Sequence, residues 1–192
     1  DPVGDGRILV DGKEVKITCP LDAIKAGIAL VPEDRKDLGL ILGMSVKDNM
    51  LLPKLGTFKS PVLNKKDISN ITGTYIQDLS IALASEEEEV KNLSGGNQQK
   101  VVIAKWMAMN PKVLIMDEPT RGIDIGAKSE IYAIMRKLTE EGMSIIMISS
   151  EMAEIQKVSD RVIVMHEGSV TGEMSVDEAT QATIMNAAIG ME

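Results

Sequence analysis

Two acidic residues follow a short apolar run in the second half of the chain. Val113–Met116 (VLIM) has the composition of a buried strand, and Asp117 and Glu118 come directly after it. Open α/β sheets bind ligands beyond the carboxyl ends of their strands. A carboxylate there can hold Mg²⁺, which takes few protein oxygens, and a second carboxylate can orient or deprotonate an attacking water. We therefore predict a Mg²⁺ ligand at Asp117 and a general base at Glu118, in preference to two merely exposed acids.

A serine followed by two glycines forms a second candidate site. Ser94, Gly95 and Gly96 lie within the octet LSGGNQQK, which begins at Leu93 and precedes a predicted helix. The first N–H groups of a helix have no intrahelical partner, and together with the helix dipole they favour phosphate. Ser-Gly-Gly taken alone favours an ordinary N-cap with flexible glycines over an anion site. The octet therefore indicates an anion site only in combination with other motifs.

The pattern around these residues alternates between strands and helices. Apolar runs predict buried strands, and apolar residues at helical spacing predict helices between them. The expected strands are residues 28–31, 113–116, 144–148 and 161–165, and the expected helices are 97–109, 127–141 and 151–157. Such alternation predicts an α/β fold whose mostly parallel sheet is covered by helices on both faces.

Other segments carry turn and cap signals. Asp-Gly at residues 11–12 predicts a β-hairpin over 7–17, and Pro20 begins a short helix that ends at Gly27. The middle of the chain, 33–90, is expected to be a small helical subdomain. Its expected parts are a capped helix over 45–52, two short helices within 68–83 and a solvated acidic link over 86–89. A turn at 166–168 leads to a strand near Val170, and a second capping box at Ser175 predicts a terminal helix ending at Gly190.

Composition excludes several classes of protein. The 192 residues carry a net charge of −8, which argues against a nucleic-acid partner because such binders need a basic face. Aromatic residues make up 2% of the chain, too few for a stacking platform. The single cysteine, Cys19, cannot form an internal disulfide, and no apolar run reaches the roughly 20 residues of a membrane span. The chain begins with Asp1 instead of Met, so we expect it to be part of a longer protein.

Taken together, the two motifs resemble those of the ATP-binding subunits of ABC transporters. The octet from Leu93 is similar to the signature loop of that family, Asp117–Thr120 (DEPT) to its Walker B segment, and Arg121–Asp124 to its D-loop. The segments 97–100 (NQQK) and 33–36 (EDRK) resemble more closely the C-terminal nucleotide-binding half of monosaccharide importers of the ribose, xylose and galactoside type. The resemblance covers almost the whole chain.

The resemblance implies an ABC-type P-loop ATPase fold with a helical subdomain and an N-terminal β-hairpin. The implied parts are the hairpin and a core strand in residues 1–32, and a Q-loop with the helical subdomain in 33–92. The signature loop with the catalytic α/β core follows in 93–174, and a C-terminal helix in 175–192.

The resemblance also implies ATP and Mg²⁺ as cofactors. It gives catalytic roles to Asp117, Glu118, Asp124 and Ser150, where Asp124 joins two sites and Ser150 stands at the switch-histidine position. It gives contacts with the cofactor to Ser94, Gly95, Gly96, Asn97, Gln98 and Glu33. Glu33, at the position of the Q-loop glutamine, is a second candidate metal ligand beside Asp117.

The implied partners are a second nucleotide-binding half, a transmembrane permease and, indirectly, a sugar-binding protein. The signature loop would cap nucleotide held by the other half, and residues 33–90 would dock the permease. The implied location is cytoplasmic, at the inner face of the cell membrane through the permease.

Three departures from the family pattern stand out. The 192 residues contain no Walker A loop, G-x-x-x-x-G-K-[ST]; the nearest match, Gly122–Ser129, has Ala127 in place of the second glycine and is better read as D-loop and helix start. Glu33 replaces the Q-loop glutamine, and Ser150 replaces the switch histidine, whereas His166 is assigned to a turn. We therefore expect the chain to be truncated before the Walker A loop, inactive alone and prone to self-association.

Two other functions remain as alternatives. The chain could be a non-catalytic interaction module that only completes the ATP site of a partner and docks a permease. An ABC-type ATPase of DNA repair or chromosome maintenance is disfavoured, since the net charge is −8 and coiled-coil heptads are absent from the sequence.

Overall fold

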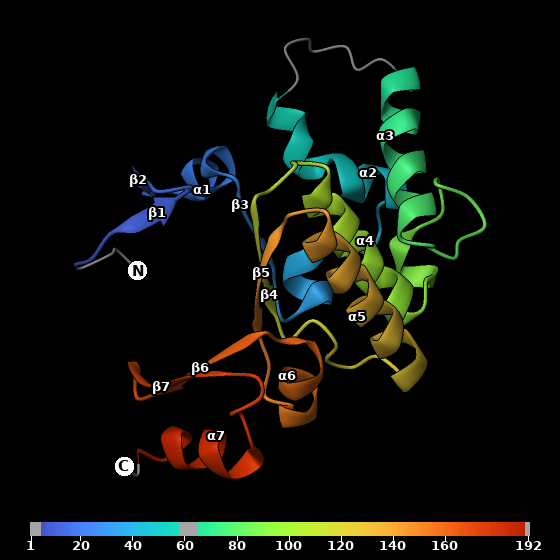
Figure 1. The fold of residues 1–192 in the computed structure, drawn as a ribbon. Coiled ribbons are helices and arrows are strands. Elements are labelled where there is room, and N and C mark those ends of the chain that lie inside the picture. Colours follow the sequence, from blue (N-terminus) through green and yellow to red (C-terminus); the bar gives the residue numbers. More distant parts are fainter. Residues whose placement is uncertain (1–4, 58–64, 191–192) are drawn as a thin grey trace. The chain divides into compact units, whose positions relative to one another are not determined.

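The computed structural model describes residues 5–57 and 65–190 of the chain (Figure 1). Residues 58–64 of the predicted helical subdomain lie outside the described residues, as do 1–4 and 191–192. The chain divides into two compact units, residues 1–148 and 149–192, and each is described by itself. The four-part division expected from the sequence stays a prediction.

The first unit alternates strands and helices. Its strands are β1 (Ile8–Val10), β2 (Lys13–Val15), β3 (Ile28–Val31), β4 (Val113–Asp117) and β5 (Ser144–Ile148). Its α-helices are α1 (Pro20–Ala26), α2 (Val46–Leu51), α3 (Lys65–Asp78), α4 (Gly95–Met107) and α5 (Ile125–Glu140). Short turns of other helix types are the π-helix η1 (Arg35–Gly39) and the 3₁₀ helices η2 (Leu52–Thr57) and η3 (Val90–Asn92). Within the described part of the chain, no helix is both long and apolar enough to cross a membrane.

A three-stranded parallel sheet forms the centre of the first unit. Strand β4 lies between β3 and β5, and Met116 pairs with Val31 on one side and with Met147 on the other. The predicted α/β fold with a parallel sheet is therefore confirmed. Because the strands are parallel, their carboxyl ends meet at one edge, where the segments after β3 and β4 begin.

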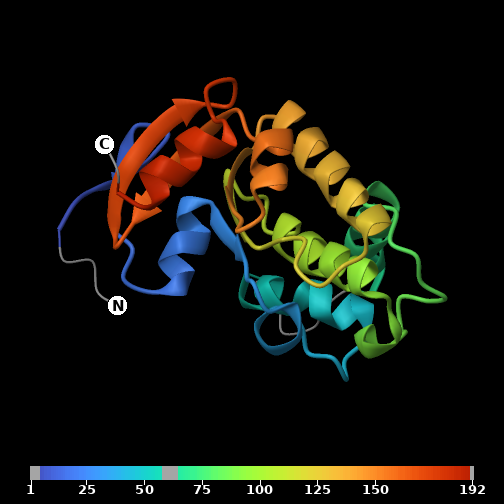
Figure 2. The ribbon, with the colours of Figure 1, turned by 90° about the horizontal axis from the view of Figure 1, so that it is seen from below.

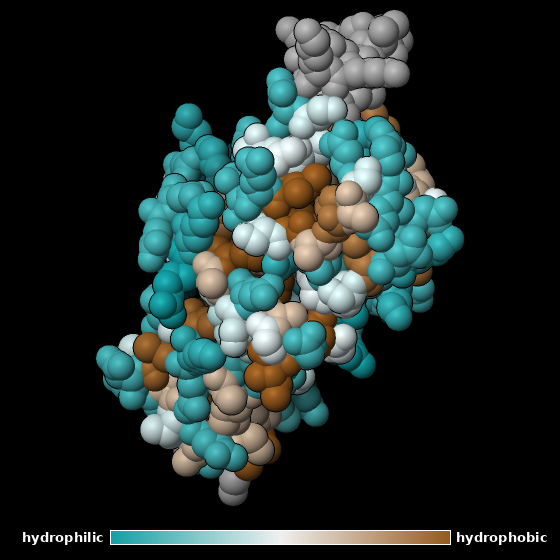
Figure 3. Space-filling view, turned by 90° about the vertical axis from the view of Figure 1, so that its right-hand side faces the viewer, coloured by the Kyte–Doolittle hydropathy of each residue, from teal (hydrophilic) through white to brown (hydrophobic). Residues whose placement is uncertain are grey.

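Helix α4 fills the core beside this sheet. Val101, Val102, Ile103 and Ala104 are fully buried, as expected for a helix that is apolar nearly all round. Figures 1 and 2 show α4 and α5 together on one side of the sheet. Seen from the side of the helices, the surface carries mostly hydrophilic residues, with hydrophobic residues gathered between them (Figure 3).

The other face of the sheet differs from the sequence prediction, which expected helices on both faces. Leu30 is 46% exposed, Ile146 53% and Ile148 49%. Successive side chains of a strand point to opposite faces, so these three side chains share the face away from buried Leu114 and Met116. In the described residues, this second face is therefore an exposed apolar surface, which we call the open sheet face.

Local signals were well predicted from the sequence. Asp11 and Gly12 have φ of 52° and 72°, the positive values of a type I′ turn, between paired strands β1 and β2. Ser45 caps α2 by accepting a hydrogen bond from the Asp48 amide at 3.0 Å. Gly27 ends α1 with φ of 85°.

Two expectations for the helical subdomain were wrong. Residues 68–83 do not form two short helices, because a single helix, α3, continues to Asp78 and the chain is non-helical from 79 to 84. The acidic segment 86–89 is not a solvated link. The Glu86 carboxylate accepts hydrogen bonds from Ser69 and from the buried Thr72, and the carbonyl oxygens of Glu86 and Glu88 accept from the first amides of α2.

The second unit contains an antiparallel strand pair and two helices. They are α6 (Met152–Val158), β6 (Arg161–His166), β7 (Ser169–Ser175) and α7 (Gln181–Ala188). Strand β6 was expected in the parallel sheet, but in the described residues it pairs antiparallel with β7. Val162, Val164, Ala179 and Ile184 form the core of this unit.

The terminal helix begins later than predicted. The Glu178 carboxylate accepts hydrogen bonds from the amide and hydroxyl groups of Ser175, which closes a turn at the end of β7. Helix α7 starts only at Gln181, with Thr180 as its N-cap. The capping-box pattern thus marks a local turn here and not the helix start.

The open sheet face leads us to expect self-association of the isolated 192-residue chain. Covering apolar surface yields roughly 25 cal/mol per Å², so a few hundred Å² supply several kcal/mol. Replacing Ile146 by Thr keeps the strand propensity but lowers the free energy gained by covering the open sheet face. The variant should therefore shift toward monomer, which size-exclusion chromatography with light scattering measures. Replacing Ile125, which is 84% exposed on α5 and not on the sheet, should leave the distribution unchanged. A single 20.8 kDa species of the unsubstituted chain at micromolar concentration would contradict the prediction.

Candidate functional site

Asp117 and Glu118 lie at the carboxyl edge of the parallel sheet. Asp117 is the last residue of β4 and pairs with Ile148 of β5, and the Glu118 amide donates to the Ile148 carbonyl oxygen at 2.9 Å. Both acidic residues are partly exposed. Among the described residues, no group of three or more His, Cys, Asp or Glu could hold a metal ion by itself. A single carboxylate suits Mg²⁺, which keeps several waters and takes its remaining oxygens from phosphates.

The backbone of Glu118 is strained. Its φ is 44°, in the left-handed region that costs a residue with a Cβ about 1–2 kcal/mol. The Glu118 carbonyl oxygen accepts a hydrogen bond from the Arg121 amide at 3.0 Å, which closes a tight turn directly after the strand. Such conformations cluster at functional sites, where the surrounding structure holds them in place. The strain therefore supports a functional role for Glu118.

The serine and glycines of the second motif form the start of α4. Ser94 is the N-cap, and its Oγ accepts hydrogen bonds from the Asn97 amide at 3.4 Å and from Asn97 Nδ2 at 3.0 Å. The helix begins at Gly95, two residues earlier than expected, because this cap includes both glycines in the first turn. Ser94 is exposed, so this turn can meet a ligand or a partner.

Asn97 and Gln98 use their amide groups within the protein. Asn97 Oδ1 accepts from the Ala82 amide at 2.9 Å. Gln98 is 5% exposed, its Nε2 donates to the Val90 carbonyl oxygen at 3.2 Å, and its Oε1 accepts from Arg35. These bonds indicate that both residues position α4. Their predicted contacts with a cofactor stay predictions.

The loop after β4 lies against the start of α4. Asp124 is the N-cap of α5, and its Oδ1 accepts from the Ala127 amide at 2.9 Å. A Cβ on Gly96 would lie 2.5 Å from Ala127 Cβ, so the two helices approach closely at this point. The Gly122–Ser129 segment is therefore a loop and a helix start, in agreement with the sequence interpretation.

Glu33 joins the segment after β3 to the loop after β4. Its carboxylate forms an ion pair with the Arg121 guanidinium, and both side chains are exposed. The next residue, Asp34, caps η1 by accepting from the amides of Asp37 and Lys36, and these two hydrogen bonds lower the pKa of Asp34. The proposed contact of Glu33 with Mg²⁺ stays a prediction.

Sequence analysis gave no role to Arg35, although it binds both candidate segments. Its guanidinium donates to Gln98 of α4 and to the backbone carbonyl oxygens of Arg121 and Gly122. No spacing rule points to such a residue, since its partners lie more than 60 positions away. The only sequence signal was its place in the EDRK segment.

Ser150, the fourth predicted catalytic residue, lies in the second unit and is exposed. The first unit contains the other predicted site residues. Among them, Glu33 is linked by its ion pair to the loop after β4, and the first turn of α4 lies against the segment that begins at Asp124. The role predicted for Ser150 stays a prediction.

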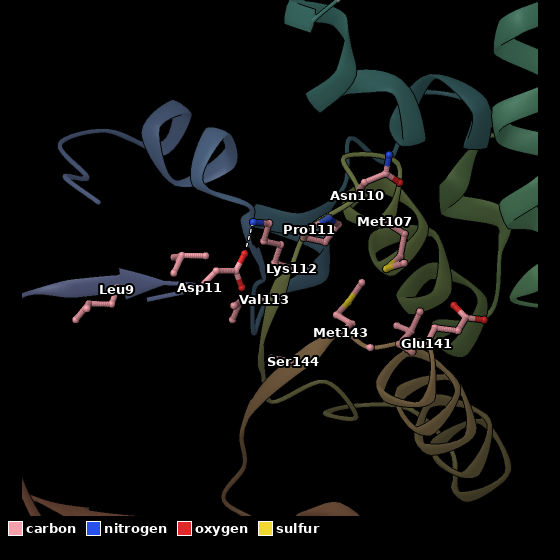
Figure 4. A pocket seen from close by; sticks show the side chains of 13 residues that line it. Leu9, Asp11, Met107, Asn110, Pro111, Lys112, Val113, Glu141, Met143 and Ser144 are labelled. Carbon is pink, nitrogen blue, oxygen red and sulfur yellow. Dashed lines mark hydrogen bonds and ion pairs between the residues drawn. The ribbon is translucent and has the colours of Figure 1, made fainter. Parts of the chain in front are cut away.

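A cleft of about 630 Å³ opens at the other end of the sheet (Figure 4). It is lined by the amino-terminal residues of β4 and β5, the end of α5 and the turn of the β1–β2 hairpin, and Lys112 forms an ion pair with Asp11 at its rim. None of the predicted site residues lines this cleft. It is therefore separate from the candidate site.

Comparison with known proteins assigns the chain to the same family that its motifs resemble. Residues 2–121 match the family model described as "ABC transporter". The whole chain is 51% identical to the ribose import ATP-binding protein RbsA of Bacillus cereus (strain ZK / E33L), and 99% of it is 49% identical to the protein of that name from Bacillus subtilis (strain 168). The chain spans 39% of the length of either relative.

Solved structures of similar fold come from the same kind of protein. Cbio1 of Clostridium perfringens, part of the ABC transporter complex cbiONQ, aligns with a TM-score of 0.76 and 27% identity over 95% of this chain and 70% of that one. The ATP-binding cassette MJ0796, a dimer bound to ADP and Pi, aligns with a TM-score of 0.76 over 92% of this chain and 75% of that one. Its 20% identity supports the likeness of fold alone.

The strain at Glu118 predicts an unusual order of stability among its variants. Asn tolerates positive φ better than Gln does, so E118N should be more stable than E118Q by about 0.5–1 kcal/mol in urea unfolding. At Glu140, in helix α5, helix propensity should reverse the order, so E140N and E140Q serve as a matched control. The prediction fails if E118N is no more stable than E118Q.

Proposed function

The chain belongs to the ABC transporter family, and on that premise we propose that it is a segment of the ATP-binding subunit of a monosaccharide importer. The observation that carries the proposal is its 51% identity, over the whole chain, to a ribose import ATP-binding protein. The resemblance predicted from the sequence is thus confirmed at the level of the family and of the α/β fold.

The residues of the candidate site fit part of a site for ATP and Mg²⁺. Asp117 offers a partly exposed carboxylate at the end of β4, where Mg²⁺ needs one or two such ligands. The first turn of α4 offers backbone N–H groups beside the exposed Ser94. The 192 residues contain no Walker A motif, so they provide no lysine and no amide cradle for the β- and γ-phosphates. The described residues therefore fit the metal-binding carboxylate and the signature turn of α4 in such a site, but not its Walker A loop.

In this proposal, bound ATP supplies a γ-phosphate whose hydrolysis drives transport. Glu118, held in a fixed turn beyond β4, orients the attacking water and accepts its proton. Ser94, Gly95 and Gly96 face nucleotide held by a partner half. Asp124 fixes the start of α5 beside this turn and connects the two sites.

Glu33 and Ser150 differ from the family pattern and set a limit on activity. Glu33 forms an ion pair with Arg121, so its carboxylate is already paired with a cation. Serine at 150 can hydrogen-bond a phosphate but carries no positive charge. We therefore expect hydrolysis on this half to depend mainly on Glu118.

The proposed partners are a second nucleotide-binding half and a permease, with a sugar-binding protein acting through the permease. Residues 33–90 would dock the permease, and Leu38 and Ile41 in this segment are 72% and 49% exposed, which supports an apolar contact. The protein would then lie on the cytoplasmic face of the membrane.

A non-catalytic interaction module is the alternative. It is not favoured, because the chain keeps Asp117 at the end of β4 and Glu118 in the strained turn after it, both partly exposed, an arrangement that a mere docking module would not need.

We expect the isolated chain to bind Mg·ATP only weakly and to hydrolyse it negligibly. Loss of a lysine and an amide cradle removes several charge-assisted hydrogen bonds of about 1.5–3 kcal/mol each, which lowers affinity by a few orders of magnitude. Isothermal titration calorimetry should show no binding in the micromolar range. Micromolar binding by the 192-residue chain would contradict this expectation.

A chimera tests the proposed function directly. In the Bacillus cereus ribose import protein, the matching 193 residues are replaced by this chain. We expect the chimera to restore ribose uptake in a strain that lacks its own subunit, and a properly folded, ATP-binding chimera that restores none would overturn the proposed import role.

Within that chimera, E118Q should slow hydrolysis by roughly 10²-fold or more at the site built on this half, because it removes the base but leaves the phosphate contacts. ATP affinity should change little. The rate is measured with the other site disabled, and E140Q on the distant end of α5 is the matched control. An unchanged single-site rate in E118Q would refute the role of Glu118.

A further inference from the structure

Arg35 connects three segments that meet at the candidate site. Its Nη1 donates to the Arg121 carbonyl oxygen at 2.8 Å, its Nη2 to the Gly122 carbonyl oxygen at 3.1 Å, and its Nε to Gln98 Oε1 at 3.4 Å. The planar guanidinium thus binds two successive carbonyl groups of the loop after β4 with one edge and the α4 side chain with its Nε.

The segment that carries Arg35 is fixed to α4. Gly39, the last residue of η1, lies so close to Val102 that an added Cβ would be 3.0 Å from Val102 Cγ2. Lys105 Nζ donates to the Gly39 carbonyl oxygen at 2.9 Å. Together with Gln98, these contacts fall on one face of α4 at helical spacing, so η1 is packed against α4 at three positions.

The Arg35 guanidinium also lies against Gly95, the first glycine in the first turn of α4. A Cβ on Gly95 would be 2.8 Å from Arg35 Nη2, and 3.4 Å from both the Gly122 carbonyl oxygen and Ile123 Cγ2. Arg35 therefore explains why position 95 has no room for a side chain. By contrast, a Cβ on Gly96 would meet Ala127 at 2.5 Å and not Arg35.

We propose that Arg35 is a positioning residue that holds the loop 121–124 against the first turn of α4. Through its two carbonyl contacts it keeps Asp124, and with it the start of α5, at a fixed separation from Ser94. The functional consequence rests on the proposed function: a movement of η1 with the helical subdomain would shift the first turn of α4 and the loop 121–124 together.

Hydrogen exchange of the isolated chain tests the positioning role without nucleotide. The amides of Arg121, Ile123 and Ala127 are hydrogen-bonded within or beside this loop. We expect R35A to speed exchange of peptides that cover residues 119–127 by about tenfold or more, since it removes two hydrogen bonds from a charged donor. A peptide over β6 and β7 should be unchanged. Unchanged exchange at 119–127, or equal acceleration over the whole chain, would overturn the proposal.

Two variants serve as controls for charge and for the neighbouring ion pair. R35K keeps the charge but not the planar fork, so it should restore only part of the protection. R121A removes an exposed ion pair with Glu33 but leaves the Arg121 carbonyl oxygen in place, so it should leave exchange at 119–127 within twofold of the unsubstituted chain. If R121A matched R35A, the ion pair and not Arg35 would hold the loop.

A double-mutant cycle gives a second, independent test. G95A should push the guanidinium off its carbonyl partners and speed loop exchange as R35A does, and adding G95A to R35A should have no further effect. G96A meets α5 directly, so its effect should add to that of R35A. Full additivity of G95A and R35A would contradict the proposal.

The chimera separates this proposal from the proposed function. There, R35A should lower kcat for ATP hydrolysis by about tenfold with little change in KM, because the phosphate cradle is supplied elsewhere. If loop exchange responds in the isolated chain but kcat does not, the positioning role holds and the proposed nucleotide role of these loops fails. If loop exchange does not respond, the positioning role itself is wrong.

Discussion

The packing of α4 against the parallel sheet is the interaction on which the rest of the first unit depends. Four successive residues of this helix, 101–104, are fully buried, and it contacts β3, α2, α3, α5 and η1. A helix that is surrounded in this way cannot tilt without opening contacts on several sides. Its first turn, with Ser94 and the two glycines, is therefore held in one place beside the loop after β4. The candidate site owes its geometry to this buried helix more than to any residue within the site.

Much of this arrangement could be predicted from local sequence. The type I′ turn at Asp11-Gly12, the cap at Ser45 and the apolar strand before Asp117 are short-range signals, and each fixes its own backbone. Errors arose where tertiary contacts decide. The continuous α3, the bound acidic segment 86–89 and the late start of α7 depend on partners distant in sequence or on a competing local turn.

In the candidate site, too, local sequence predicts some features and tertiary contacts decide the others. Asp117 and Glu118 could be located because a strand ends there, but the positive φ of Glu118 follows from the turn that the surrounding fold imposes. The inward amides of Asn97 and Gln98 and the contacts of Arg35 could not be foreseen, since their partners lie on other elements. The self-association expected from the sequence anticipates an exposed apolar surface, but the sequence could not place that surface on this face, because a continuous apolar run predicts burial on both faces.

The close approach of Gly96 and Ala127 restricts how this sequence can diverge. Position 96 cannot gain a side chain while α5 keeps its present backbone, because a single added carbon already falls 2.5 Å from Ala127 Cβ. Neutral drift at position 96 is therefore conditional on α5, and a side chain there becomes accessible only after the crossing of α4 and α5 has widened. Such epistasis would keep the crossing tight even in lineages where the chemistry of the nearby acids had been lost.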